Sequence, residues 1–196
     1  MNKKICFFGI FDEEYSRNRV LIKGFEENDY EVLLCKVNPR LHSGISKFIY
    51  LYKEYKKLSN KDFDYVIVGF PGHSVMWLAR MLFGRKVIFD AFVSLYNSNV
   101  HDRKIYNIFS LLAVKDWLLD FYSFHLAHMV LMDTDAHIAY ISKTFFIRKK
   151  KCIRVFVGTD ERIFYPRHKP ENGNENEVFT VHFHGSYIPL QGVSTI

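Results

Sequence analysis

Mostly apolar runs of strand length recur along this chain, with room for one helix between successive runs, and this spacing constrains the fold most. We expect strands over 5–10, 31–37, 65–69, 86–90, 129–132 and 152–157. Continuous apolar runs are typical of strands that are buried on both faces. Repeated strand–helix units with such strands predict an α/β fold, a doubly wound parallel sheet of the Rossmann-like kind.

Helical periodicity fills the segments between these strands. We expect helices over 16–28, 42–58, 105–126 and 134–145, and another opened by Pro71 and Ser74. Two of these helices are expected to direct apolar stripes inward: Ile45, Phe48, Ile49, Tyr52 and Tyr55 in the second, and Ile108, Leu112, Leu119 and Tyr122 in the longest. A long polar loop is expected from Ala91 to about Lys104.

The strand-and-glycine pattern that opens the chain at Gly9 recurs near its end at Gly185. Residues 179–184 have the composition of a buried strand, and the preceding segment is rich in Pro, Gly, Asn and Glu, as linkers are. We therefore expect a domain over 1–165, a linker over 166–178, and the first strand and loop of an incomplete second domain over 179–196.

The formal net charge is +6, and basic residues concentrate in 53–57 and 148–151. Such runs are typical of solvated surfaces. A patch that docks on an anionic membrane is the sharper alternative. No nucleic-acid partner is expected, because the basic runs lack an aromatic stacking platform.

Cysteine use and hydropathy indicate where such a chain works. Cys6, Cys35 and Cys152 are widely spaced within apolar runs, which predicts buried, reduced thiols in a cytoplasmic protein. No stretch approaches the ~20 apolar residues of a spanning helix. We expect a cytoplasmic protein, with peripheral contact at the inner face of a membrane as the further option.

Ligands of open parallel sheets bind beyond the carboxyl ends of the strands, so residues that follow each strand are candidates. After the first strand, Gly9 permits close backbone approach, and a phosphate fits the helix start at Ser16 and Arg17. Helix capping by Ser16 is the alternative. The lone glycine argues against a dinucleotide dehydrogenase, which needs G-x-G-x-x-G.

The third and fourth strands are followed by further candidates. Gly72 indicates either a required backbone shape or a ligand passing close by. His73 is a candidate for a hydroxyl contact, although an ordinary turn residue is the more frequent case. Asp90 ends an apolar run, where a carboxylate must meet water, a partner or a ligand.

The loop after Asp90 is dense in hydrogen-bonding groups, as functional loops often are. Its candidates for holding a hydroxylated molecule are Ser94, Tyr96, Asn97, His101, Asp102 and Arg103. After the fifth strand come Thr134 and His137, with helix capping by Thr134 as the favoured alternative.

Two other kinds of chemistry have weak support. His182 and His184 share one face of a strand, as metal ligands can, but no further ligand types cluster beside them, and no metal site is expected. The chain has no G-x-S-x-G elbow for acyl transfer.

Taken in order, these blocks resemble the N-terminal half of a GT-B glycosyltransferase of family four, a family of retaining enzymes that use nucleotide sugars. The resemblance covers essentially all 196 residues. It rests on the motifs at 6–9, 15–18, 68–73, 89–96, 133–137, 155–160, 164–166 and 184–192.

The resemblance implies that this domain binds the acceptor, that a C-terminal domain binds the nucleotide sugar, and that transfer occurs in the cleft between them. It places Gly9, Ser16, Arg17, Gly185, Ser186, Gln191 and Gly192 on the side of the donor diphosphate. It places Gly72, His73, Asp90, Thr134, His137 and the loop candidates on the acceptor side. Asp90 is the best catalytic candidate. Ser186 and Gln191 stand where many relatives have Arg and Lys.

We therefore expect part of a hexosyltransferase that moves a sugar from a nucleotide-sugar donor to a glycan or lipid-linked acceptor in cell-envelope polysaccharide biosynthesis. The nucleotide sugar is a substrate, and no cofactor is expected. This chain alone is expected to be inactive, because the donor domain is missing. The alternative is a non-catalytic, flavodoxin-like module that binds a ligand or a partner through the polar loop.

Overall fold

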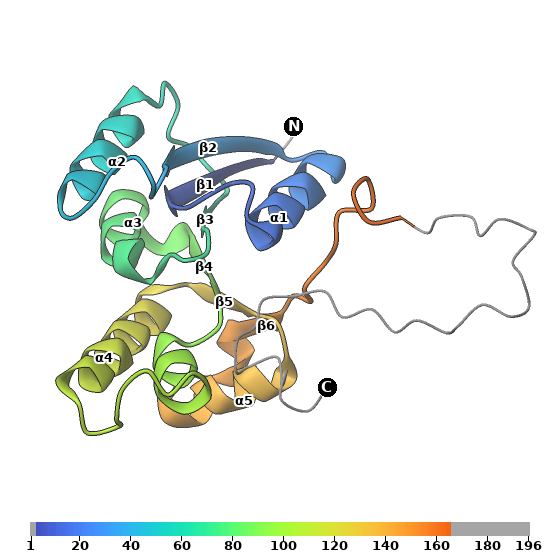
Figure 1. The fold of residues 1–196 in the computed structure, drawn as a ribbon. Coiled ribbons are helices and arrows are strands. Elements are labelled where there is room, and N and C mark those ends of the chain that lie inside the picture. The colour runs from blue at the N-terminus through green and yellow to red at the C-terminus, as the bar shows by residue number, and fades with distance from the viewer. Residues whose placement is uncertain (1–2, 166–196) are drawn as a thin grey trace, which may run out of the picture.

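Six parallel strands form one sheet in the computed structural model, which describes residues 3–165 (Figure 1). They are β1 (Lys4–Ile10), β2 (Glu31–Val37), β3 (Tyr65–Val68), β4 (Val87–Phe92), β5 (Met129–Met132) and β6 (Cys152–Arg154). The sheet order is β2-β1-β3-β4-β5-β6, and every neighbouring pair is parallel. The predicted doubly wound α/β sheet is confirmed.

Helices cover both faces of the sheet. They are α1 (Ser16–Glu27), α2 (Ser46–Lys57), α3 (Met76–Phe83), α4 (Leu111–Leu126) and α5 (Asp135–Thr144). Helix α1 lies on one side, and α2, α3 and α4 lie on the other (Figure 1). The order of the strands reverses where the chain passes from β2 to β3, which brings the loops after β1 and β3 together at the carboxyl edge.

Strand β1 shows why the strands read as continuous apolar runs. Cys6 and Phe8 face the larger core cluster, beneath α2, α3 and α4, whereas Ile5 and Phe7 face a smaller cluster beneath α1. All four side chains are at most 1% exposed. Successive strand residues point to opposite faces, so a strand covered on both faces needs apolar residues at each position.

The second helix differs from the prediction in its start and its inner face. It begins at Ser46 rather than at residue 42. Leu51 is its buried residue, flanked by Phe48 and Tyr55, whereas the predicted inward residues Ile45, Ile49 and Tyr52 are exposed. Of the predicted stripe, only Phe48 and Tyr55 pack against the core, because this helix also has a partly apolar outer side.

The longest helix differs more. It begins at Leu111, capped by the Ser110 hydroxyl, which accepts a hydrogen bond from the backbone N–H of Ala113 at 3.1 Å. The predicted inward residues Ile108, Leu112 and Tyr122 are exposed. Its buried residues are Ala113, Asp116, Asp120, Ser123 and Phe124. The prediction was wrong because this helix has polar residues on its inner side, and the site explains them.

Several smaller expectations have mixed outcomes. Strand β4 continues to Phe92, and the expected loop contains a π-helical turn at Asn97–Asp102. Cys6 and Cys35 are buried free thiols as predicted, whereas Cys152 is only half-buried. Among the described residues, no helix is both long and apolar enough to cross a membrane.

The expected linker over 166–178 and the expected first strand and loop of a second domain over 179–196 lie outside the described residues. The same holds for Gly185, Ser186, Gln191, Gly192, His182 and His184. Their predicted roles stay predictions.

Candidate functional site

A buried ion pair joins α1 to β4 at the carboxyl edge of the sheet. The Arg17 Nη2 atom lies 2.7 Å from Oδ1 of Asp90, and Arg17 Nε donates to Oδ2 at 3.0 Å. Arg17 Nη1 donates to the carbonyl oxygen of Val155 at 2.9 Å. One guanidinium group thus connects the helix after β1, the end of β4 and the chain beyond β6.

This pair is shielded from water, since the side chains of Arg17 and Asp90 are 2% and 0% exposed. Burial raises the pKa of the Asp90 carboxyl; Arg17 opposes this rise, and the negative charge of Asp133 adds to it. Neither side chain is presented to a ligand. The structure therefore gives the predicted catalytic candidate and the predicted phosphate ligand a bracing role in this arrangement.

Asn18, next to Arg17, ties the loops after β1 and β3 together. Its Nδ2 donates to the carbonyl oxygens of Asp12 at 3.0 Å and Phe70 at 2.7 Å, and its Oδ1 accepts from the Phe70 N–H at 3.1 Å. Asn18 is 0% exposed. Sequence reasoning assigned it no role, although a polar residue beside the first turn of a core-packed helix was a signal, since buried amides are almost always hydrogen-bonded.

Gly9 lies near the end of β1, Gly72 in the loop after β3 and Ser16 at the start of α1, all at this edge of the sheet. Gly9 has a φ of +151°, a backbone angle that residues with a side chain rarely adopt. A Cβ on Gly72 would lie 2.4 Å from Cγ1 of Val68, so close packing against β3 requires this glycine. Ser16 is exposed and is the first residue of α1, after Tyr15 at the N-cap position, which makes no side-chain capping bond. The alternative of capping by Ser16 is therefore wrong.

Asp120, on the inner side of α4, holds the start of the polar loop. It accepts hydrogen bonds from the Ser94 hydroxyl at 2.6 Å and from the backbone N–H groups of Leu95 at 3.1 Å and Tyr96 at 2.9 Å. The Nε2 atom of His73 lies 3.2 Å from Oδ1, outside hydrogen-bond geometry. Asp120 is 0% exposed. His73 and Ser94, both predicted to contact a ligand, are buried around this carboxylate.

Asp116, one helical turn earlier, holds the rest of this loop. Its Oδ2 accepts from Asn99 Nδ2 at 2.7 Å and from the Tyr106 hydroxyl. The spacing of four residues puts Asp116 and Asp120 on the same side of α4. Sequence reasoning missed both carboxylates, although that spacing within an apolar helix was a detectable signal.

The other loop candidates lie nearer the surface. Asn97 Nδ2 donates to Asp102 Oδ2 at 3.3 Å, and both side chains are half-buried. His101 and Arg103 are exposed, and the His101 ring lies edge-on to Tyr96. An open hollow of about 620 Å³ lies beside His101, lined by residues 100, 101 and 104–108. These groups can hydrogen-bond a hydroxylated molecule.

A histidine–carboxylate pair follows β5. His137 Nδ1 lies 2.5 Å from Oδ1 of Asp133, and the histidine side chain is 33% exposed. Thr134 accepts a hydrogen bond from the backbone N–H of His137 at 3.2 Å, so the alternative that Thr134 caps α5 is confirmed. A carboxylate on one ring nitrogen fixes the imidazole and leaves the other nitrogen for a hydroxyl or a proton.

Within residues 3–165, no three His, Cys, Asp or Glu side chains converge in a way that could hold a metal ion. Comparisons with protein-family models, with curated proteins and with solved structures find no match. The functional conclusion therefore depends on the site and on the resemblance of its motifs.

Proposed function

We propose that residues 3–165 form the acceptor-binding half of a glycosyltransferase that takes a sugar from a nucleotide-sugar donor. The observation that supports it most is the polar segment after β4, which Asp116 and Asp120 hold in place beside an open hollow at the carboxyl edge. A fixed array of donors and acceptors is suited to orienting a hydroxyl group for attack.

Exposed groups on this edge would bind the acceptor. His101, in the π-helical turn, and Arg103, just after it, would contact its hydroxyl groups, and the Nε2 atom of the half-buried His137 would contact it from α5. Arg17, Asn18 and Asp90 would keep the loops in register without touching the substrate.

The donor diphosphate would lie over the exposed start of α1, near Gly9 and Ser16, where helix N–H groups favour an anion. Arg17 is already engaged by protein groups, so most of the neutralising charge would come from beyond residue 165. By resemblance, the donor phosphate itself takes the acceptor proton, and the site then needs no strong protein base.

A binding experiment tests the acceptor side. We expect oligosaccharide fragments of the source cell's envelope polysaccharide to shift the amide NMR signals of residues 97–103 and 137. His101→Ala and Arg103→Ala should each weaken this binding about fivefold or more, because each removes a hydrogen bond worth roughly 1 kcal/mol. Arg85→Ala, which removes an exposed arginine elsewhere, is the matched control. Shifts confined to other surfaces, or none at all, would contradict the proposal.

A further inference from the structure

Helix α4 carries apolar residues on its outward side as well as on its inward side, where Phe124 is buried among polar residues. Asp116, Asp120 and Ser123 are at most 5% exposed. The outward side chains are Leu111, Val114, Leu118 and Tyr122, which are 87%, 50%, 42% and 60% exposed. Their spacing of three and four residues forms one apolar stripe on the side that is usually polar in a surface helix.

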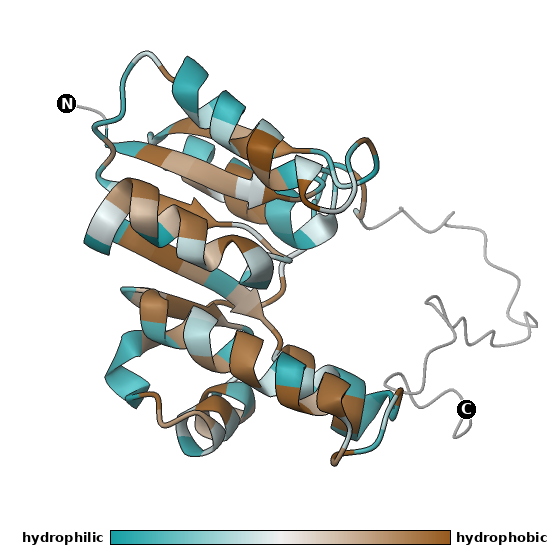
Figure 2. Ribbon diagram, turned by 90° about the vertical axis from the view of Figure 1, so that its left-hand side faces the viewer, coloured by the Kyte–Doolittle hydropathy of each residue, from teal (hydrophilic) through white to brown (hydrophobic). Residues whose placement is uncertain are grey.

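The segment before α4 extends this apolar surface. Ile105 is 60% exposed, Ile108 44%, Phe109 91% and Leu112 52%. We call these four residues, together with Leu111, Val114, Leu118 and Tyr122, the outer face of α4. Figure 2 shows α4 below α2 and α3 on the side turned to the viewer, with hydrophobic residues along its length. Contiguous exposed apolar surface of this kind marks an interaction site.

The fully exposed charged residues beside this face along the chain are basic, namely Arg103, Lys104 and Lys115. Asp102 is half-buried and accepts a hydrogen bond from Asn97, and both carboxylates of α4 are buried. The basic run over 148–151 lies at the C-terminal end of α4, where Lys151 Nζ donates to the carbonyl oxygen of His125 at 3.0 Å.

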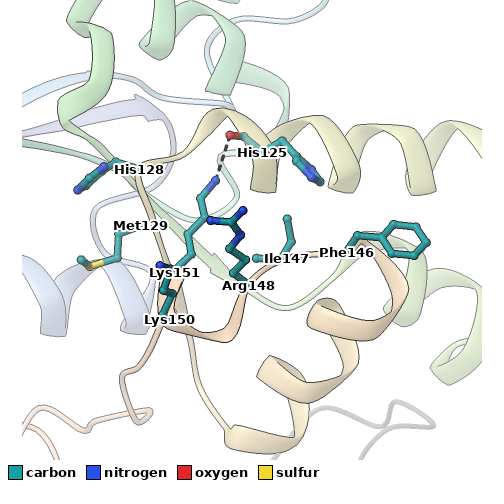
Figure 3. A pocket seen from close by; sticks show the side chains of 8 residues that line it. All are labelled: His125, His128, Met129, Phe146, Ile147, Arg148, Lys150 and Lys151. Atoms are coloured by element: carbon teal, nitrogen blue, oxygen red, sulfur yellow. Dashed lines mark hydrogen bonds between the residues drawn. The ribbon is translucent and has the colours of Figure 1, made fainter.

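A hollow of about 460 Å³ lies at this junction (Figure 3). It is lined by His125, His128, Met129, Phe146, Ile147, Arg148, Lys150 and Lys151, with no carboxylate among them. The figure shows the Arg148 and Lys151 side chains extending from the β6 side toward the end of α4. Phe146, at its rim, is 76% exposed. The junction thus offers cations next to exposed apolar surface.

We propose that the outer face of α4 and the basic run over 148–151 dock on an anionic lipid bilayer. The apolar side chains would enter the boundary between headgroups and acyl chains, and the cations would bind lipid phosphates. Charge favours this partner over a second copy of the chain, since pairing two such faces would bring their exposed cations together with no fully exposed carboxylate of residues 102–126 to oppose them.

Docking would also place the candidate acceptor loop near the membrane. Asp116 and Asp120 hold residues 94–106 against the inner side of the same helix whose outer side would contact lipid. This inference stands independently of sugar transfer, because it depends only on apolar exposure and charge.

Vesicle co-sedimentation of the full chain tests the proposal. Vesicles of phosphatidylcholine with phosphatidylglycerol should bind the protein, those of phosphatidylcholine alone should bind it far more weakly, and added salt should release it. Leu118→Ser should lower the partition coefficient about tenfold, because it removes apolar area from the contact. Lys149→Gln and Lys150→Gln should each lower it about fivefold.

Leu34→Ser and Lys3→Gln, at exposed sites of β2 and just before β1, are the matched controls and should bind as the wild type does. Circular dichroism checks that every variant is folded. Equal binding by all variants, or no binding to anionic vesicles, overturns the proposal. So does a concentration-dependent dimer in sedimentation velocity that Leu118→Ser abolishes, because the face would then be an interface between copies.

Discussion

At the scale of single residues, several polar side chains that the sequence predicted to contact a ligand are buried and contact other protein groups instead. Arg17, Asp90, His73 and Ser94 are all at most 4% exposed. The sequence indicated that Asp90 must meet water, a partner or a ligand, and the structure shows that it has a protein partner. The sequence could not identify that partner, which lies 73 residues away on α1.

The buried pair predicts a large asymmetry between single and double substitutions. Asp90→Asn should lower the free energy of unfolding by about 3–5 kcal/mol, because it leaves the Arg17 charge buried without an opposite charge. The double variant Arg17→Met/Asp90→Leu should recover most of that loss, since it removes both charges. Urea denaturation measures both values. A single variant that costs less than about 1 kcal/mol would show that the pair does not brace the site.

At the scale of elements, strands were more predictable than helix faces. Strand β2 has the predicted bounds, because burial on both faces leaves an apolar run in the sequence itself. Helix α4 was assigned the wrong inner face, since it has an exposed apolar stripe in addition to its buried Ala113 and Phe124. Only the tertiary structure shows that loop hydrogen bonds satisfy Asp116 and Asp120 and let them be buried.

The hydrogen bonds of Asp120 predict that α4 holds the start of the polar loop in place. Asp120→Ala should leave the Leu95 and Tyr96 N–H groups and the Ser94 hydroxyl without their acceptor. Hydrogen exchange at residues 95 and 96 should then become about fivefold faster or more, because each lost bond is worth roughly 1 kcal/mol. NMR measures this exchange residue by residue. Asp62→Ala, at an exposed carboxylate, should leave it unchanged, and unchanged exchange in Asp120→Ala would contradict the role given to Asp120.

At the scale of the whole molecule, the loops that follow the parallel strands lie at one edge of the sheet. The chain after β6 returns to this edge and contacts α1. Arg17 binds the Val155 carbonyl, and Asp160 lies 3.5 Å from Arg19 Nε and 3.6 Å from Lys23 Nζ. The last described residues therefore pass along α1, on the proposed donor side. The fold class and this edge were predictable from alternating strands and helices, whereas contacts across the edge join residues too distant in sequence for any local pattern to reveal.

The most direct test of the proposed function is a transfer assay with radiolabelled UDP-glucose, UDP-galactose, UDP-N-acetylglucosamine and GDP-mannose. The acceptor would be a lipid and glycan extract of the source cell. We expect residues 1–196 alone to move no label, and to move label from one of these donors once a nucleotide-sugar-binding domain is joined to the chain. Turnover by residues 1–196 alone, or no transfer from any of these donors by the joined protein, would contradict the account.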